Sequence, residues 1–115
     1  MGTRAPTVWE DHPTGGARLE AGPWLDTPAW VAWLEAPSTT SFSYPVVDPQ
    51  HGYIAGFLTV RKERRQRGGS YWIAYWRRGG RLCKAYLGPA TAVTTGRLRT
   101  LSAAWLAAPP VPAAL

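Results

Sequence analysis

The fold is decided by residues 56–88, GFLTVRKERRQRGGSYWIAYWRRGGRLCKAYLG. Three runs in this stretch are rich in aromatic and β-branched residues, which are typical of strands. They are 56–64, 70–78 and 81–87. A glycine-containing basic loop separates the first two runs, and Gly79-Gly80 separates the last two. Two glycines can both adopt the positive φ that a two-residue type I′ turn requires. The stretch therefore predicts a three-stranded antiparallel meander.

The Gly79-Gly80 turn also predicts the register, because it places Arg78 opposite Arg81. Trp76 then faces Cys83 and Trp72 faces Leu87 on one side of the sheet. That side is expected to be packed, and its residues on the last two strands are Trp72, Ala74, Trp76, Ala85 and Leu87. The other side pairs Tyr75 with Lys84, and it is expected to be open, aromatic and basic.

One helix is predicted before the meander in the sequence and another after it. Thr27 can cap and Pro28 suits a first helical position, so a short N-terminal helix is expected at about 28–36, with Trp30 on its apolar face. Thr94 or Thr95 can cap a second helix that runs to about Ala107 and covers the apolar side of the sheet.

The remaining segments complete the domain organisation. Residues 41–46 alternate polar and apolar side chains, and Pro45 favours an edge position for that strand. Residues 1–23 have no period and are expected to form a mobile leader. Residues 108–115 are expected to form an extended tail rich in Pro and Ala. The prediction is one α+β domain at 24–107, with a short N-terminal helix, a three- to four-stranded antiparallel sheet and a C-terminal helix packed on one sheet face.

The charge is divided along the 115 residues. Residues 1–59 hold two Arg against six acidic residues, whereas residues 60–115 hold eleven Lys or Arg against Glu63 alone. Nine of these cations lie between Arg61 and Lys84, among tyrosines and tryptophans. A clustered, arginine-rich and aromatic surface is typical of nucleic-acid binding. The alternative reading is a solubilising face.

Other classes of protein are less well supported by the residues. The single cysteine, Cys83, cannot form an intramolecular disulfide or a multi-cysteine zinc site. His12 and His51 have no predicted catalytic neighbours, and no phosphate loop or dinucleotide motif occurs. We expect no enzyme activity, no cofactor and no metal. The uncharged runs are too short to cross a bilayer, so a soluble cytoplasmic protein without a membrane partner is expected.

The residues 57–63, 71–77 and 84–88, with Arg97-Leu98 after them, resemble a segment near the N-termini of large LuxR-type transcriptional regulators. The pattern there is Phe-Thr-x-Arg-Lys-Glu, Tyr-Trp-x-Ala-Tyr-Arg and Tyr-Leu-Gly. The likeness extends over about 24–107 and implies an accessory segment of a regulator.

A more distant resemblance is to the arm-binding domains of tyrosine-recombinase integrases and to the plant ethylene-response-factor domain. These domains are built from three strands and a packed helix, and in the plant domain alternate strand residues enter the DNA major groove. The resemblance implies a groove-facing set consisting of Thr59, Arg61, Tyr75, Arg77, Lys84 and Tyr86. This chain has Tyr75 where the plant domain has an acidic base-reading residue, so base specificity is not carried over.

The leading hypothesis is a small DNA-binding module that acts in transcriptional regulation or in the DNA handling of a mobile element. Arg61 and Arg77 are the candidates for base contact, since Arg paired with guanine is the commonest specific contact. Arg64, Arg65 and Arg67 lie in the loop between the first two strands and suit phosphate contact. Two alternatives stay open: binding of RNA or single strands, and a protein-interaction role. The oligomeric state and the recognition sequence are not indicated.

Overall fold

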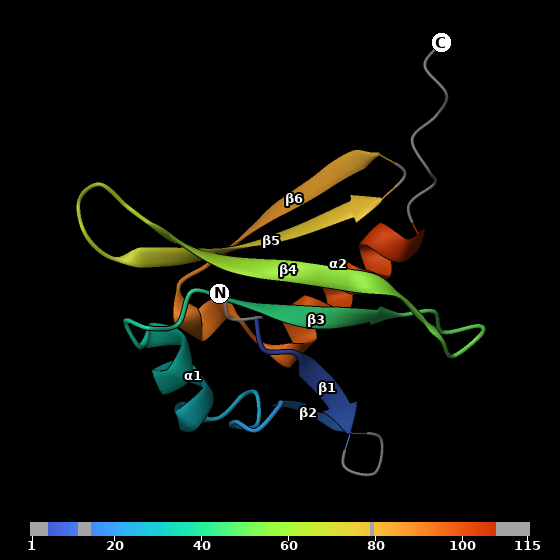
Figure 1. Cartoon of the computed structure of the whole chain (residues 1–115), viewed down its shortest axis with the longest axis horizontal. Coiled ribbons are helices and arrows are strands. Elements are labelled where there is room, and N and C mark those ends of the chain that lie inside the picture. The colour runs from blue at the N-terminus through green and yellow to red at the C-terminus, as the bar shows by residue number, and fades with distance from the viewer. Residues whose placement is uncertain (1–4, 12–14, 79, 108–115) are drawn as a thin grey trace.

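The computed structural model describes residues 5–11, 15–78 and 80–107, which form two antiparallel sheets with α-helices packed against the larger one (Figure 1). The strands are β1 Val8–Asp11, β2 Gly16–Leu19, β3 Ser41–Val47, β4 Ile54–Arg64, β5 Ser70–Arg78 and β6 Arg81–Gly88. The helices are α1 Pro28–Glu35, the short 3₁₀ helix η1 Ala90–Ala92, and α2 Thr95–Ala107. The α+β class and the C-terminal helix are as predicted.

The larger sheet has the strand order β3-β4-β5-β6, and every neighbouring pair is antiparallel. In Figure 1 the helices lie on one side of it, and the β4–β5 hairpin projects beyond the rest of the molecule at the left. Helix α1 occupies the predicted segment. It is not an N-terminal element, however, because β1 and β2 precede it.

The predicted register of the last hairpin is confirmed over most of its length. Arg78 pairs with Arg81, Tyr75 with Lys84 and Ala74 with Ala85. Gly80 has φ 79°, as the turn requires, while Gly79 lies outside the described residues.

The predicted pairing of Trp72 with Leu87 is wrong. Trp72 pairs with Gly88, and the register shifts between Trp72 and Ile73. The additional residue in β6 forms a bulge, which bends a strand locally. Gly88 has φ 114°, a conformation that side chains rarely adopt, and the chain enters η1 soon after it. Leu87 is still 5% exposed, so the bulge keeps it in the core.

The core lies between the sheet and the helices. Trp72 and Ala74 on β5 are buried in the same cluster as Trp30 of α1 and Leu98 of α2. The indole Nε1 of Trp30 donates to the carbonyl of Val93 at 2.8 Å, so this buried polar group is satisfied. Trp33 and Trp105 are half-buried and pack against its edge.

Both helix starts follow the capping signals. The Thr27 hydroxyl accepts from the amide of Trp30, with Pro28 at the first turn. The Thr94 hydroxyl accepts from the amide of Arg97 at 3.2 Å. A second acceptor at the start of α2 comes from far away in sequence, because Asp26 Oδ1 accepts from the amide of Thr95 at 2.9 Å. Asp26 has φ 64°, a left-handed conformation that Asp tolerates better than most residues.

The interpretation of residues 1–23 as a mobile leader is wrong for residues 5–11 and 15–23. The β1–β2 hairpin buries Val8, Ala17 and Leu19 in the core. It also joins the edge of β3, where the amide of Ser43 donates to the carbonyl of Pro6 at 2.8 Å. The domain therefore begins before residue 24. Residues 1–4 and the predicted tail at 108–115 lie outside the described residues.

The edge position predicted for β3 is confirmed, since β3 is the first strand in the sheet order. The backbone of Ser43 turns its amide away from β4 and toward Pro6. Pro45, two residues further on, has its nitrogen on the same side, because strand geometry repeats every two residues. Pro45 therefore removes no hydrogen bond between β3 and β4.

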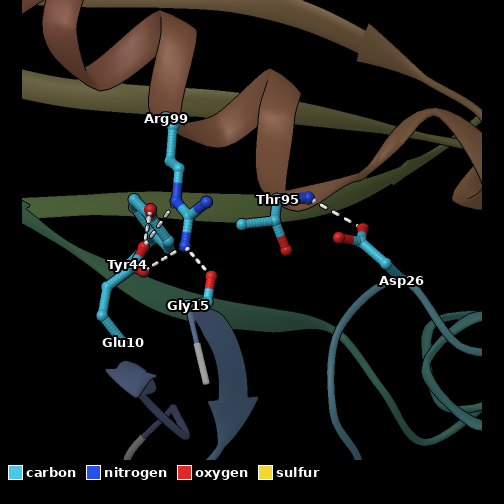
Figure 2. Close-up of polar contacts among 6 residues, drawn as sticks. All are labelled: Glu10, Gly15, Asp26, Tyr44, Thr95 and Arg99. Carbon is cyan, nitrogen blue, oxygen red and sulfur yellow. Dashed lines mark hydrogen bonds and ion pairs between the residues drawn. The ribbon is translucent and has the colours of Figure 1, made fainter. Parts of the chain in front are cut away.

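Arg99 of α2 binds the N-terminal hairpin through hydrogen bonds and an ion pair (Figure 2). Arg99 Nε donates to Glu10 Oε2 at 3.2 Å, and its Nη2 donates to the carbonyl of Gly15 at 2.7 Å. The Tyr44 hydroxyl donates to the same Glu10 carboxylate. Burial, and next Glu10, raise the pKa of Tyr44 above its ordinary 10.0, while the hydrogen bond to Glu10 raises the pKa of Arg99.

Candidate nucleic-acid interface

The six residues of the predicted groove-facing set lie on the side of the sheet turned away from the helices, which we call the open face. Its residues are Thr59, Arg61, Tyr75, Arg77, Lys84 and Tyr86. Tyr75 is half-buried and the other five are exposed. Cross-strand pairs align Thr59, Tyr75 and Lys84 in one row.

The next row of the open face is Arg61, Ile73 and Tyr86. Ile73 is only 6% exposed, although it points away from the core. This row therefore places a buried apolar side chain between Arg61 and Tyr86. In the adjacent row, Lys84 Nζ lies 6.0 Å from the centre of the Tyr75 ring, a cation–π distance.

Within the described residues, no ion pair neutralises a charge on the open face. Among the described residues, ion pairs join His51 to Asp48 and Arg99 to Glu10, and neither includes a residue of the open face. The acidic residue on this side of the sheet is Glu63, which pairs in register with Tyr71 at the hairpin end.

The loop between β4 and β5 is a closed hairpin turn. The amide of Arg65 donates to the carbonyl of Gly69 at 3.1 Å, and the amide of Gly68 donates to the carbonyl of Arg65 at 3.3 Å. Gly68 and Gly69 have φ 89° and 78°, which glycine adopts without strain.

The side chain of Arg65 folds back onto the sheet. Its guanidinium lies 5.0 Å from the centre of the Tyr71 ring, and Nη2 donates to the Tyr86 hydroxyl at 2.6 Å. A surface depression forms here, which we call the tip hollow. Its lining is Arg64, Arg65, Gln66, Arg67, Tyr71 and Tyr86. The structure thus joins the predicted loop arginines to the open face through Tyr86.

Sequence reasoning missed several residues of this surface. Tyr71 has the same strand parity as Tyr75, so alternation could have included it. Arg97 of α2 also reaches this surface. Its Nη2 donates to the backbone carbonyl of Tyr86 at 3.2 Å, and no local pattern connects these positions.

Lys62 shows how strand parity decides the role of a cation. It stands between Arg61 and Glu63 but points to the covered side, where Nζ donates to the carbonyl of Ala36 at 2.9 Å. Desolvation, and next the charge of Arg64, lower the pKa of Lys62. Lys62 also lies over the Trp72 ring at 5.6 Å. Lys62 therefore packs at the edge of the core and is not part of the open face.

The opposite end of the open side is apolar. The rings of Trp9 and Phe57 meet edge to face, with 6.3 Å between centroids, and each is more than 40% exposed. Leu82 near the β5–β6 turn is also exposed. The surface therefore changes from basic at the tip hollow to apolar near Trp9.

A hollow of about 810 Å³ lies between α2 and the segment after β3. Its wall is mostly apolar, with Val47 and Leu106 among the lining residues. The carboxylates of Glu10 and Asp48 are held by Arg99 and by the backbone of Gln50. The lining of this hollow contains no group of side chains that favours one class of ligand. The open face therefore remains the candidate site.

The residues considered for catalysis or metal binding do not converge. Cys83 is half-buried at the edge of the core. His51 is exposed, and its Nδ1 lies 3.2 Å from Asp48 Oδ2, an interaction that lowers the pKa of Asp48. In the part of the chain that the structure describes, no three His, Cys, Asp or Glu side chains group as metal ligands. His12 lies outside that part.

No protein-family model, curated protein or solved structure matches the chain. None of the helices in the described ranges is long and apolar enough to span a membrane.

Proposed function

We propose that the protein binds duplex DNA through the open face. The observation that carries this proposal is the placement of Arg61, Arg77 and Lys84 on three adjacent strands, exposed and outside any ion pair among the described residues. Such a surface attracts a polyanion, and its aromatic residues add contact area.

The dimensions of the sheet suit a groove. Adjacent strands lie about 4.8 Å apart, so three strands span about 10 Å, close to the roughly 12 Å width of the DNA major groove. Arg61 and Arg77 would contact base edges from such a ribbon. Thr59, Tyr75 and Lys84 stand beside them, while Arg64, Arg65 and Arg67 would contact the phosphates on one flank.

The resemblances found in the sequence support the same proposal. The integrase and ethylene-response-factor domains combine three strands with one helix, and here β4, β5 and β6 pack with α2 through a common core. The LuxR-type resemblance favours transcriptional regulation, and the integrase resemblance favours mobile-element DNA. We infer a non-catalytic role in the cytoplasm, without a cofactor.

The test measures duplex affinity for Arg61→Ala and Arg77→Ala. Each loss should be about 1–3 kcal/mol and larger on a preferred sequence than on random duplex. Arg18→Ala is the matched control. Arg18 is an exposed arginine of the smaller sheet and should change affinity less than about twofold at physiological salt, where distant charges are screened. Equal losses on every sequence from both variants would contradict base reading.

RNA and single strands are tested in the same assay. Exposed rings such as Tyr86, 52% exposed, can stack on unpaired bases. Competition among duplex DNA, duplex RNA and single strands separates these ligands, and a preference for either RNA form or for single strands would overturn the choice of duplex DNA.

A protein partner is the second candidate function, favoured by the apolar end at Trp9 and Phe57. Salt distinguishes the two. Phosphate-based binding weakens steeply with ionic strength, so binding that survives about 0.5 M salt would support the protein partner.

A further inference from the structure

We propose that Arg65 and the Tyr86 hydroxyl together form a seat for one backbone phosphate of the bound DNA. This inference rests on the proposed function and specifies where on the open face the DNA backbone is held. The seat lies in the tip hollow, where the β4–β5 hairpin meets the end of β6.

Contacts within the protein position Arg65 beside Tyr86. Its backbone is fixed by the hydrogen bonds with Gly68 and Gly69. Its guanidinium is fixed by the Tyr71 ring at 5.0 Å and by the Tyr86 hydroxyl at 2.6 Å. A free arginine side chain loses rotamer entropy when it binds an anion. These contacts place the Arg65 guanidinium beside Tyr86, so less reorientation of the side chain is needed when an anion binds.

The Tyr86 hydroxyl can donate a hydrogen bond to a phosphate while it accepts one from Arg65. A phenol has one O–H to donate and lone pairs that accept. Because the oxygen accepts from Arg65 Nη2, the proton points to another acceptor, and the hollow around it is lined by cations. Arg65 has further N–H groups in the same plane. A phosphate oxygen beside Tyr86 would accept from both, and charge-assisted bonds of this kind are the strong ones.

The surroundings of the seat are positively charged. Arg64 and Arg67 line the same hollow, and no acidic side chain does so. On the other side of the strand, Arg97 donates to the backbone carbonyl of Tyr86 at 3.2 Å. This bond brings a further positive charge from α2 to the end of β6. Glu63, the acid on this side of the sheet, pairs with Tyr71 and is half-buried.

The position of the seat agrees with the proposed base contacts. Arg61, Ile73 and Tyr86 form one row, so Tyr86 lies two strands from Arg61, a distance of about 10 Å between backbones. That separation is smaller than the roughly 12 Å width of the major groove. With a phosphate held at Tyr86 on one edge of the groove, Arg61 would lie inside the groove and not on the opposite backbone.

The experiment is a double-mutant cycle of Arg65→Ala and Tyr86→Phe, measured as affinity for one duplex at two salt concentrations. Tyr86→Phe keeps the ring and removes only the hydroxyl, and we expect a loss of about five- to tenfold with little change in salt dependence. Arg65→Ala should weaken binding and reduce the slope of log K against log salt by about one. In the Arg65→Ala background, Tyr86→Phe should cost less than about twofold, because the two groups act as a unit.

Tyr53→Phe is the matched control, since it removes a hydroxyl from an exposed ring in the β3–β4 connection, outside the open face and the hollow, and it should bind as the parent does. Melting temperatures check that every variant is folded. If the parent binds duplex DNA and Tyr86→Phe has no effect, or if the two losses simply multiply, the phosphate seat is wrong while the proposed function stands. A parent that does not bind duplex DNA overturns both.

Discussion

The whole site assignment depends on which side of the sheet is packed, and Trp72→Ala tests that assignment directly. Trp72 is 1% exposed and contacts Phe42, with 5.7 Å between ring centroids. A tryptophan buries about 200 Å², and at about 25 cal/mol per Å² this is worth about 5 kcal/mol. Alanine retains part of that, so the expected loss in the free energy of unfolding is about 3–5 kcal/mol.

The comparison variant is Tyr86→Ala on the open face. Tyr86 is 52% exposed, so its removal takes away only about half of the ring contact. Its hydrogen bond from Arg65 is exposed and adds little. We expect a loss of about 1–2 kcal/mol. For a domain whose total stability is about 5–15 kcal/mol, the two variants should be well separated.

The assay is urea unfolding followed by far-ultraviolet circular dichroism, which does not depend on the fluorescence of the removed tryptophan. The midpoint for Trp72→Ala should fall far below that of the parent, while Tyr86→Ala should stay close to it. The reverse order, with Trp72→Ala stable and Tyr86→Ala unfolded, would show that the two faces are inverted. The proposed DNA contacts would then fail with them.

Three further outcomes are expected. Burial raises the folded-state pKa of Tyr44 above 10.0, so the stability linked to its neutral form is complete below pH 10 and is lost as the pH rises above that value. The urea midpoint of Tyr44→Phe should therefore decline less steeply at alkaline pH than that of the parent. An unchanged decline would contradict this. Arg99→Ala should lower the free energy of unfolding by about 1 kcal/mol, a value discounted for the partial exposure of Arg99. It should also speed amide hydrogen exchange in β1 more than in α2, because Arg99 holds the hairpin against the helix. Equal changes in the exchange of β1 and α2 would contradict this role. Gly88→Ala should lower the free energy of unfolding by about 1–3 kcal/mol in the same urea assay, because φ 114° is strained for a residue with a Cβ, and a parent-like midpoint would show that the bulge relaxes at no cost.

Local chemistry was sufficient for the meander and its two faces. The alternation in β5 and the Gly79-Gly80 turn placed Tyr75 opposite Lys84 and Trp76 opposite Cys83, as the structure has them. These features depend on side-chain parity and turn geometry, which act between residues close in sequence. The α+β class and the capping of α2 at Thr94 follow from signals of the same short range.

Only the tertiary structure decided the N-terminal hairpin, the bulge at Gly88 and the tip hollow. The four-residue strands β1 and β2 have no pattern that would stand alone, and their stability comes from Val8 and Leu19 in a shared core. The contacts of Arg65 and Arg97 with Tyr86 join residues 21 and 11 positions apart. Such contacts form only after the chain has closed the loops between these residues. The packed core offsets the entropic cost of closing those loops, so no local pattern in the sequence predicts the contacts.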